Sequence, residues 1–448
     1  MGWKLWSHSP LAFGKATGDS DVKVKTAACG GRVARRGAGR VYDTIVIGAG
    51  PAGAVAAGRC AELGLRTRLL DRREFPRFKA CGGGVTRAAQ ELLGARLPRR
   101  ALETNCDRLI ADFGGKRVDV RMPRPFMATV RREAFDVCLV EAAIAAGAEF
   151  TPGLEAEDVE VGTGYAEVRV RRVGGGAGGG GVRPEGPTEY VRASVLIVAD
   201  GVMGRISQRL AGAPDPAGLA FCLVAEAVPD DRGLTAVRMG NSLGTPDGGA
   251  IQCFYGEVLA GYGWIFPLNG HLNVGLGAPA GRAADVLARW PAYLQSNGLR
   301  LLAKVRGAHI PVGGPRRRLS GDRWMLAGDS AGLADPFSGE GLRYAAVSGH
   351  LAGDMAAETL ERGDGRAQTL RSYERRVEGA CGQELRLAAK IQRLVAFRPR
   401  VMENLFLGNP NAFRHLLGIL DGTVSYRQML SRLIPLLPRA YWGAGLSP

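Results

Sequence analysis

The sequence is poor in the residues that build metal sites. It has 5 histidines and 8 cysteines in 448 residues, and both are scattered along the chain. No Cys-x-x-Cys pair and no Cys/His cluster with metal-site spacing occurs. We therefore expect no metal, and we expect most of the cysteines to be reduced, buried side chains, as is usual in the cytoplasm.

Long hydrophobic runs are also missing. No apolar segment reaches the roughly 18 residues that a membrane-spanning helix needs. Residues 1–40 lack the apolar core of a secretory signal and end in a basic stretch that is poor in acids. We interpret residues 1–40 as a flexible basic extension; a targeting peptide and a misplaced start codon are the alternatives.

Acidic residues are fewer than basic ones. The 43 Asp and Glu residues face 59 Lys and Arg residues, which gives a net charge of +16 at pH 7. This surplus suits an anionic membrane surface or a phosphorylated substrate, or else it reflects ordinary solvated faces of an arginine-rich chain. Nucleic acid is not an expected partner, because no nucleic-acid-binding motif accompanies the charge.

What the sequence does contain is a glycine-rich turn between a predicted strand and a predicted helix. Residues 41–47 have the pattern of a buried parallel strand and lead into Gly48-Ala-Gly-Pro-Ala-Gly53. In such a turn Gly48 permits the tight bend, Gly50 lets the backbone approach a pyrophosphate, and Gly53 lets the helix pack on the strand. Asp71 ends the next predicted strand, about 20 residues on, where a carboxylate binds a ribose. This order predicts a dinucleotide site.

A second glycine-rich stretch follows a short apolar run late in the chain. Trp324-Met-Leu-Ala327 predicts a strand that brings Asp329 to its carboxyl end, within reach of a ribose hydroxyl. Farther on, Ser338-Gly-Glu-Gly341 opens a helical pattern. The free backbone N–H groups around Gly339 and Gly341 are then expected to face an electron-rich ring or a phosphate.

Three further positions have the character of binding residues. Cys81 precedes Gly82-Gly-Gly84, and three successive glycines form neither a helix nor a good strand interior, so this loop comes close to a ligand or to another segment. Arg132 begins an apolar helix, where it either holds a phosphate or is an ordinary exposed arginine. Asp200-Gly201 ends the last of three strands predicted between residues 153 and 200.

These motifs, in this order, resemble those of the flavoprotein monooxygenase and reductase superfamily typified by para-hydroxybenzoate hydroxylase. The resemblance runs from about residue 41 to 355, with one departure: Gly204 stands where the Asp-Gly fingerprint usually has serine. It implies one noncovalent FAD, extended across a Rossmann-type domain. Any nicotinamide donor would bind transiently, since no second Gly-x-Gly-x-x-Gly motif is credibly placed outside the polyglycine segment.

One segment points to a particular family within this superfamily: Tyr262-Gly-Trp264-Ile-Phe266-Pro267. It resembles the Tyr-x-Trp-x-Phe-Pro signature of the geranylgeranyl reductase family, which also carries the Cys-Gly-Gly-Gly loop; Leu259 departs from it by replacing a proline. By alternation, Tyr262, Trp264 and Phe266 share one face of a strand. There they either line an apolar tunnel for an isoprenoid chain or form an aromatic stripe in a sheet core.

The family resemblance implies FAD contacts at Ala52, Asp71, Cys81, Gly82, Gly84, Arg132, Ala156, Asp329, Gly341 and Leu342. The motif positions Gly48, Gly50, Gly53, Asp200 and Gly339 complete the predicted cofactor site. Cys81 is the only thiol in a glycine loop predicted to touch the ring. We hypothesise that it positions the flavin or relays a proton; the alternative is a packing cysteine.

The function implied is that of an FAD-dependent reductase that saturates C=C bonds of a polyprenyl, geranylgeranyl-type chain on a lipid, quinone or chlorophyll-like substrate. Hydride would pass from N5 of the reduced flavin inside an apolar tunnel. NAD(P)H and ferredoxin are both open as electron donors. The alternative is an aromatic monooxygenase that uses NAD(P)H and oxygen. A halogenase is not favoured, because no Trp-x-Trp-x-Ile-Pro segment is present.

The expected fold class is α/β: a Rossmann-type FAD-binding domain, an inserted, mainly antiparallel β-sheet substrate domain and a helical C-terminal region. We assign residues 41–210 and 308–355 to the FAD-binding domain, 211–307 to the substrate domain and 356–448 to the helical region. The FAD-binding part includes a Gly-rich insertion at 174–181 and a substrate-side segment at 100–130. The C-terminal helices either lie on a bilayer as a peripheral contact or simply cover the substrate domain.

Overall fold

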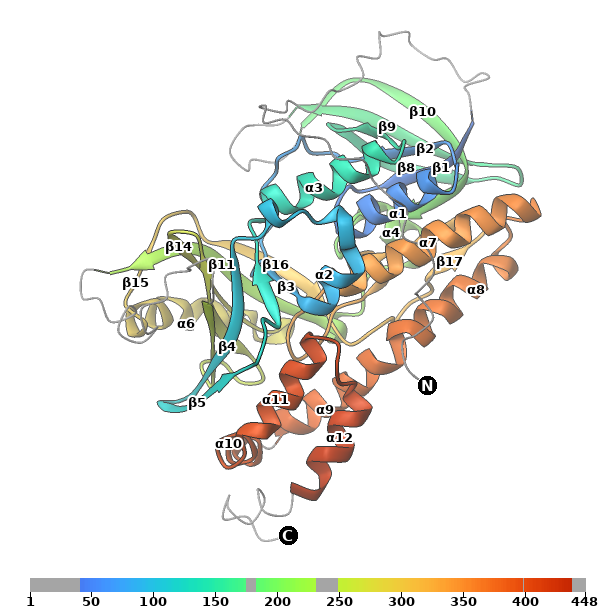
Figure 1. Cartoon of the computed structure of the whole chain (residues 1–448). Coiled ribbons are helices and arrows are strands. Elements are labelled where there is room, and N and C mark those ends of the chain that lie inside the picture. The colour runs from blue at the N-terminus through green and yellow to red at the C-terminus, as the bar shows by residue number, and fades with distance from the viewer. Residues whose placement is uncertain (1–40, 175–182, 231–248, 398, 437–448) are drawn as a thin grey trace. The chain divides into compact units, whose positions relative to one another are not determined.

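The computed structural model describes residues 41–174, 183–230, 249–397 and 399–436. The predicted extension 1–40 and nearly all of the Gly-rich insertion lie outside these residues. Within them, the framework consists of a sheet of eight strands and a sheet of ten strands, shown with their helices in Figure 1.

The first sheet is largely parallel, and β1 lies at its centre. Its main path is β17-β18-β10-β1-β2-β7, and the β8–β9 hairpin extends it along β10. The strands are β1 Tyr42–Ile47, β2 Thr67–Leu70, β7 Glu149–Thr151, β8 Leu154–Val161, β9 Ala166–Gly174, β10 Arg183–Val198, β17 Ser320–Gly321 and β18 Trp324–Leu326. The parallel order β7-β2-β1-β10-β18 is that of a Rossmann fold, which confirms the predicted fold class.

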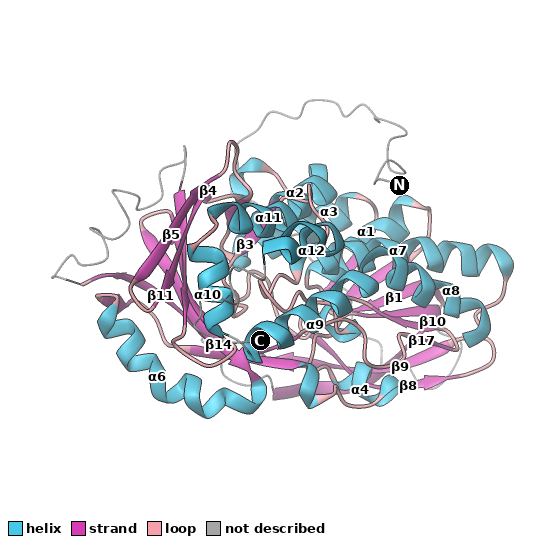
Figure 2. Cartoon of the chain, turned by 90° about the horizontal axis from the view of Figure 1, so that it is seen from below, coloured by secondary structure: helices cyan, strands magenta, loops and turns pink. Residues whose placement is uncertain are grey.

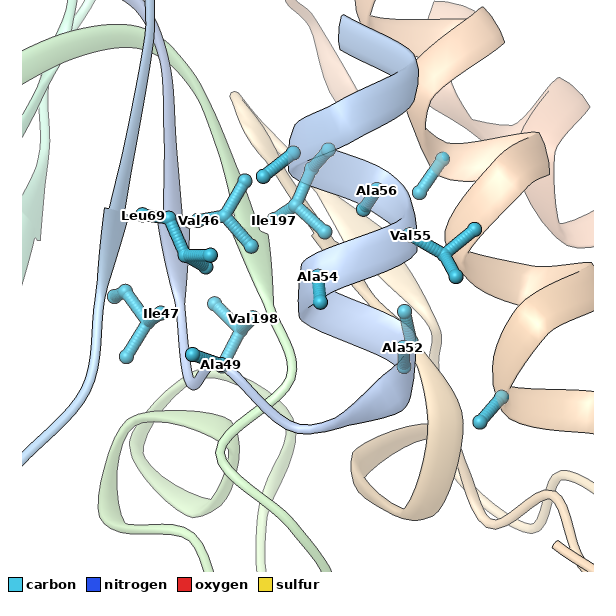
Figure 3. Close-up of a cluster of buried hydrophobic side chains, with 14 of the residues drawn as sticks. Val46, Ile47, Ala49, Ala52, Ala54, Val55, Ala56, Leu69, Ile197 and Val198 are labelled. Carbon is cyan, nitrogen blue, oxygen red and sulfur yellow. The ribbon is translucent and has the colours of Figure 1, made fainter. Parts of the chain in front are cut away.

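Helix α1 (Pro51–Glu62) packs between this sheet and helix α7 (Leu342–Arg362). Figure 3 shows Val46 and Ile197 of the sheet on one side of α1 and a second helix on the other. Such close packing needs small residues. A Cβ atom at Gly349 of α7 would lie 2.4 Å from the carbonyl oxygen of Ala52, so glycine is required there. The contact holds α7 beside the first turn of α1.

Three shorter or flanking helices complete this half of the framework. Helix α3 packs against α1, where its Ala143 approaches Gly58. The bounds of these helices are α2 Arg87–Leu93, α3 Arg132–Ala145 and α4 Arg205–Ala211.

The second sheet is mainly antiparallel and combines strands from distant parts of the chain. Its main path is β15-β11-β14-β13-β12-β4-β6-β3, with β16 on β11 and β5 on β4. The strands are β3 Gly84–Thr86, β4 Thr104–Phe113, β5 Lys116–Arg121, β6 Met127–Thr129, β11 Leu219–Pro229, β12 Gly249–Tyr255, β13 Tyr262–Leu268, β14 His271–Pro279, β15 Leu299–Leu301 and β16 Arg306–Pro311. The two parts of the sheet meet where β4 pairs in parallel with β12.

Helices cover both faces of the second sheet. Helix α6 (Ala283–Ser296) packs Trp290 and Tyr293 into a core with β11 and β14. On the other face, Phe413 and Tyr426 are buried in one cluster with residues of β4, β5 and β12. Figure 2 shows helices α10 (Pro399–Leu407), α11 (Pro410–Leu420) and α12 (Tyr426–Leu433) gathered on this side. Helix α9 spans Gln383–Phe397, and α8 (Ala367–Val377) packs against α7 and β17 of the first sheet.

The apolar sides of α11 and α12 are therefore used inside the protein. Leu417, Met429 and Leu433 are all buried. Over the part of the chain that the structure describes, no helix combines the length and apolarity needed to cross a bilayer.

Candidate functional site

A cavity of about 1510 Å³ is lined by both sheets, by the loop after β2, by the start of α7 and by helices α11 and α12. It is larger than the roughly 300–1,000 Å³ of a typical small-molecule pocket, so it has room for more than one ligand. The residues predicted from the sequence that line it are Gly48, Gly50, Ala52, Asp71, Cys81, Gly82, Gly84, Arg132, Ala156, Asp200, Tyr262, Trp264, Phe266, Asp329, Gly339, Gly341 and Leu342. Gly53 is the predicted position that is not among the lining residues.

The glycine turn after β1 has the shape that a phosphate-binding turn requires. Gly48 has φ +96°, and a Cβ atom there would lie 2.4 Å from the carbonyl oxygen of Ala199. A Cβ atom at Gly53 would lie 1.8 Å from the carbonyl oxygen of Gly48, so Gly53 serves the packing of helix on turn. Helix α1 has no side-chain cap. Its first N–H groups therefore have no acceptor within the helix and can bind an anion.

Asp71 stands at the carboxyl end of β2, beside this turn. Its carboxylate is only 9% exposed and accepts hydrogen bonds from the N–H groups of Ala49 at 2.8 Å and Arg73 at 2.9 Å. An ionised carboxylate has about four acceptor positions, so two remain for ribose hydroxyls. The guanidinium of Arg77 lies 3.9 Å from the same carboxylate and 3.3 Å from that of Asp136. Sequence reasoning missed Arg77, since no motif marks it.

Arg132 is buried and holds a carboxylate of its own helix. It donates to both oxygens of Asp136, at 2.8 and 3.0 Å. Burial acts to lower the pKa of Arg132, but the charge of the Asp136 carboxylate and its hydrogen bonds act in the opposite direction, and the pKa is raised overall. The guanidinium is thus a permanent positive charge at the cavity wall, beside Cys81.

The glycines after Cys81 approach the aromatic side chains of β13. A Cβ atom at Gly82 would lie 3.2 Å from both the Phe266 ring and the indole nitrogen of Trp264. A Cβ atom at Gly84 would lie 2.5 Å from Cε of Met127. The loop therefore packs closely on the aromatic strand, and the Cys81 Sγ accepts a hydrogen bond from its own loop, from the N–H of Gly83 at 3.3 Å.

The three aromatic residues of β13 form a continuous strip along the cavity. Their ring centroids are 6.0 Å apart from Tyr262 to Trp264 and 6.3 Å apart from Trp264 to Phe266. The Tyr262 hydroxyl donates to the carbonyl oxygen of Ser338 at 2.6 Å, and burial raises its pKa well above the usual range. The Trp264 indole donates to Oδ1 of Asn273 at 2.9 Å. Hydrogen bonds therefore fix the strip at one end, Tyr262, and at its middle, Trp264.

The far end of the cavity is apolar, and sequence reasoning named none of its side chains, although β4 lies in the predicted substrate-side segment 100–130 and β12 in the predicted substrate domain 211–307. Leu109 of β4, Ile251 and Tyr255 of β12, and Leu416 and Leu420 of α11 line it. Because α11 carries no motif, no local signal in the sequence pointed to its leucines as part of the site.

The segment 335–341 closes the cavity below α7. The Asp335 carboxylate is 1% exposed and accepts from the N–H groups of Phe337 and Ser338, both at 2.9 Å, and from the Tyr426 hydroxyl at 2.6 Å. Glu340 is 8% exposed and accepts a hydrogen bond from the Thr86 hydroxyl. Burial raises the pKa of Glu340 to about 7, although Arg343 and Thr86 act to lower it. Sequence reasoning passed over Glu340 within its glycine motif.

Asp200 has a structural use beside its place at the cavity. One of its carboxylate oxygens accepts from the N–H groups of Ile206 and Ser207, at 2.9 and 3.1 Å, and the other accepts from the Ser330 hydroxyl at 3.0 Å. It therefore caps the start of α4 and ties it to the segment after β18. Asp329 lines the cavity next to this tie.

These features fit an FAD molecule. A glycine turn with an uncapped helix suits its pyrophosphate, and the Asp71 carboxylate with free acceptor positions suits its adenosine ribose. The wall formed by the 81–84 loop and the 338–341 segment suits a planar ring. Among the residues that the structure describes, no group of three or more His, Cys, Asp or Glu residues could hold a metal ion.

Comparison with known proteins gives the same cofactor. A family profile described as "FAD binding domain" matches residues 41–243. The protein is accordingly an FAD-dependent oxidoreductase.

Curated relatives define the family more narrowly. The chain is 33% identical over 336 residues to the menaquinone reductase of Mycolicibacterium smegmatis, with 70% of this chain and 76% of the relative covered. It is 32% identical over 372 residues to digeranylgeranylglycerophospholipid reductase 2 of Methanopyrus kandleri, with 79% of this chain and 86% of the relative covered. The chain belongs to the geranylgeranyl reductase family, as its motifs predicted.

Solved structures agree in fold. A geranylgeranyl bacteriochlorophyll reductase-like protein from Thermoplasma acidophilum superposes with a TM-score of 0.71 at 19% identity, over 90% of this chain and 99% of that one. A flavin-dependent brominase, Bmp2, gives 0.64 at 20% identity, over 86% and 94%. At such identities the likeness concerns the fold alone.

Proposed function

We propose that this protein saturates C=C bonds in the polyprenyl chain of a lipid or quinone. The observation that carries the proposal is one continuous cavity: dinucleotide-binding features line one end, and the apolar residues of β4, β12 and α11 line the other. The relatives named menaquinone reductase and digeranylgeranylglycerophospholipid reductase support this substrate class.

The chain's own residues hold the alkene and keep the reaction dry. Leu109, Ile251 and Leu420 offer an apolar wall along which an isoprenoid chain can lie. The fixed strip of Tyr262, Trp264 and Phe266 lies between that wall and the 81–84 loop and sets the depth to which the chain enters. When bound and reduced, FAD supplies the hydride for the reaction.

Cys81 acts, in this proposal, as a positioning residue. Its loop is held from two sides: Asn273 donates to the Cys81 carbonyl oxygen at 2.9 Å, and the charged Arg132 lies beside the thiol. These contacts hold the glycine loop in one position at the cavity wall. Cys81→Ser should retain FAD and lose turnover; full turnover in that variant would return Cys81 to a packing role.

The experiment that tests the function is anaerobic. The enzyme, loaded with FAD and reduced with dithionite, is incubated with a geranylgeranyl lipid, and the product mass is measured. A gain of two hydrogens per double bond is expected. The absence of any gain, together with oxygen-dependent hydroxylation of an aromatic substrate, would favour the monooxygenase alternative instead.

A matched pair of variants tests where the isoprenoid chain of the substrate lies. Leu420→Trp adds bulk at the apolar end, whereas Leu287→Trp adds it on the outer side of α6, where the leucine is 56% exposed. We expect Leu420→Trp to lower saturation of geranylgeranyl chains more than that of shorter geranyl chains. Equal effects on both chain lengths would place the isoprenoid elsewhere.

We further propose that the protein meets an anionic membrane at the mouth of this cavity, and not through its C-terminal helices. Phe78 and Leu302 are 50% and 49% exposed, although both are large and apolar. Phe78, Lys304 and Arg306 line the cavity, and the Arg306 guanidinium lies 5.8 Å from the centroid of the Phe78 ring. Exposed apolar side chains flanked by cations are suited to an anionic bilayer.

Vesicle co-sedimentation tests the membrane contact. Wild-type protein should bind vesicles rich in phosphatidylglycerol more than vesicles of phosphatidylcholine. The double variant Phe78→Ser, Lys304→Glu should bind them several-fold less, and the control Leu287→Ser should bind like wild type. Equal binding by the double variant would refute the contact at this rim.

A further inference from the structure

We infer that the Glu340 carboxyl is the acid that protonates the alkene during reduction. This inference rests on the proposed function and names the group that completes it. Glu340 is a carboxyl on the cavity wall, one residue before Gly341, where the resemblance places the flavin ring. Its side chain does not cap helix α7, and it forms no ion pair among the described residues.

The position of the carboxyl is held from two directions. Its Oε1 accepts a hydrogen bond from the Thr86 hydroxyl, which at the same time accepts from the N–H of Ala89 and so begins helix α2. The backbone N–H of Glu340 donates to the Ser338 hydroxyl at 3.2 Å, and its carbonyl oxygen accepts from the N–H of Asp335 at 2.8 Å. Thr86 engages only Oε1, and Glu340 lines the cavity, so we assign the transferred proton to Oε2.

The surroundings raise the pKa of this carboxyl to about 7, so that a large share of it is protonated near neutral pH. Burial disfavours the anion, and the nearby Asp335 carboxylate adds to the effect, whereas Arg343 and the Thr86 hydroxyl favour the anion. The phenols of Tyr344 and Tyr426 also lie close enough to interact with it, but burial raises their pKa values well above the usual range, so they stay neutral. A general acid is most effective when its pKa lies near the working pH.

The reaction then balances. The π bond of the alkene opens, one carbon takes a hydride from reduced FAD, and the neighbouring carbon takes the proton as the O–H bond of Glu340 breaks. The alkene gains two electrons, which reduced FAD would supply with the hydride. The Glu340 carboxylate afterwards recovers a proton from water.

The test compares wild type with Glu340→Gln, which keeps the shape and cannot donate a carboxylic proton. In single turnovers of the dithionite-reduced enzyme with a geranylgeranyl lipid, we expect a rate on the order of 100-fold lower. FAD content, lipid affinity and the rate of flavin reoxidation by oxygen should be unchanged. The wild-type rate should fall as pH rises above about 7, and that fall should vanish in Glu340→Gln.

Two further variants separate proton donation from a structural role. Glu340→Asp keeps a carboxyl and should recover part of the rate together with the pH dependence. Thr86→Val removes a hydrogen bond that favours the anion, so the pH at which the rate falls should move upward. A readout that needs no turnover is the infrared band of protonated carboxylic acid in the FAD-free protein, which between about pH 5 and 7 should be stronger in wild type than in Glu340→Gln.

The outcomes distinguish this inference from the function beneath it. If wild type saturates the lipid and Glu340→Gln does so at the same rate with the same pH profile, Glu340 is not the acid and the reductase function stands. If wild type saturates no polyprenyl chain, the function fails and the proton role fails with it. If Glu340→Gln loses its FAD, the rate and pH profile of Glu340→Asp and Thr86→Val decide.

Discussion

The side chain of Asn273 links Trp264 to Cys81. Its Oδ1 accepts from the Trp264 indole at 2.9 Å, and its Nδ2 donates to the Cys81 carbonyl oxygen at 2.9 Å. The aromatic strip and the glycine loop, whose residues lie far apart in the sequence, are thereby held in register by one buried amide. Asn273 lies outside both residues 262–267 and residues 81–84, yet its side chain bonds to both segments.

Replacing this amide should loosen both segments. Asn273→Ala leaves the buried Trp264 N–H without an acceptor, which costs about 1–3 kcal/mol in the free energy of unfolding. The exposed Asn269→Ala serves as control and should change stability by less than about 0.5 kcal/mol. Urea unfolding gives both values, and equal stabilities in the two variants would contradict the link.

The glycine turn allows a matched test of cofactor binding. Gly48→Ala combines a left-handed backbone with a clash at the Ala199 carbonyl oxygen, so we expect loss of bound FAD and of stability. Gly64 has φ +78° and nothing within 4 Å of an added Cβ. Gly64→Ala should therefore cost only about 1–2 kcal/mol of backbone strain and keep FAD. The absorbance of bound flavin after gel filtration reports the difference; equal FAD content would show that the clash is relieved.

The bond from Tyr426 to Asp335 should be worth more than a neutral hydrogen bond. Tyr426→Phe removes a donor from a buried carboxylate, so we expect a loss of about 1.5–3 kcal/mol of stability. Because Asp335 also holds the N–H groups of Phe337 and Ser338, the visible spectrum of bound FAD should shift. Tyr165→Phe, at a residue 38% exposed, is the control. A spectrum and stability like those of wild type would rule out this coupling.

Glu340 should make stability depend on pH. Its pKa rises from 4.5 to about 7 on folding, so between these values the native state binds more protons than the unfolded state. Stability from this group is therefore fully present below pH 4.5 and is lost as pH rises through about 7, by at most roughly 3 kcal/mol. Glu340→Gln should abolish this fall. Melting temperatures of both proteins across that range test it; parallel curves would contradict the shift.

The parts of the site that belong to a known motif could be predicted from the sequence. The turn at Gly48, the carboxylate of Asp71 and the strand before Asp329 were predictable because each sits at a strand end, where local pattern fixes position. The fold class followed from the same order of strands. The FAD cofactor and the family were also predictable, because the same motifs are typical of FAD-binding proteins and of this family.

The rest of the site depends on contacts that local pattern cannot reveal. Tyr426 and Leu420 reach the cavity only because α11 and α12 fold back over β4 and β12. The amphipathic character of these helices allowed two interpretations, contact with a bilayer or packing on the substrate domain. The buried cluster shows which of their side chains pack inside the protein. Glu340 was visible in its motif, but its burial and its bond to Thr86 arise from a strand more than 250 residues away in sequence.

The parallel pairing of β4 with β12 has a consequence for how the chain is made. Residues 104–113 leave the ribosome long before residues 249–255, and until the later strand arrives, one edge of β4 has no partner in this sheet. Contacts of such high sequence separation form slowly and expose strand edges meanwhile. The same delay applies to the first sheet, because β10 pairs with β18, which is synthesised much later. Both halves of the cavity therefore close late in synthesis, and a nascent chain has no complete flavin site to fill before then.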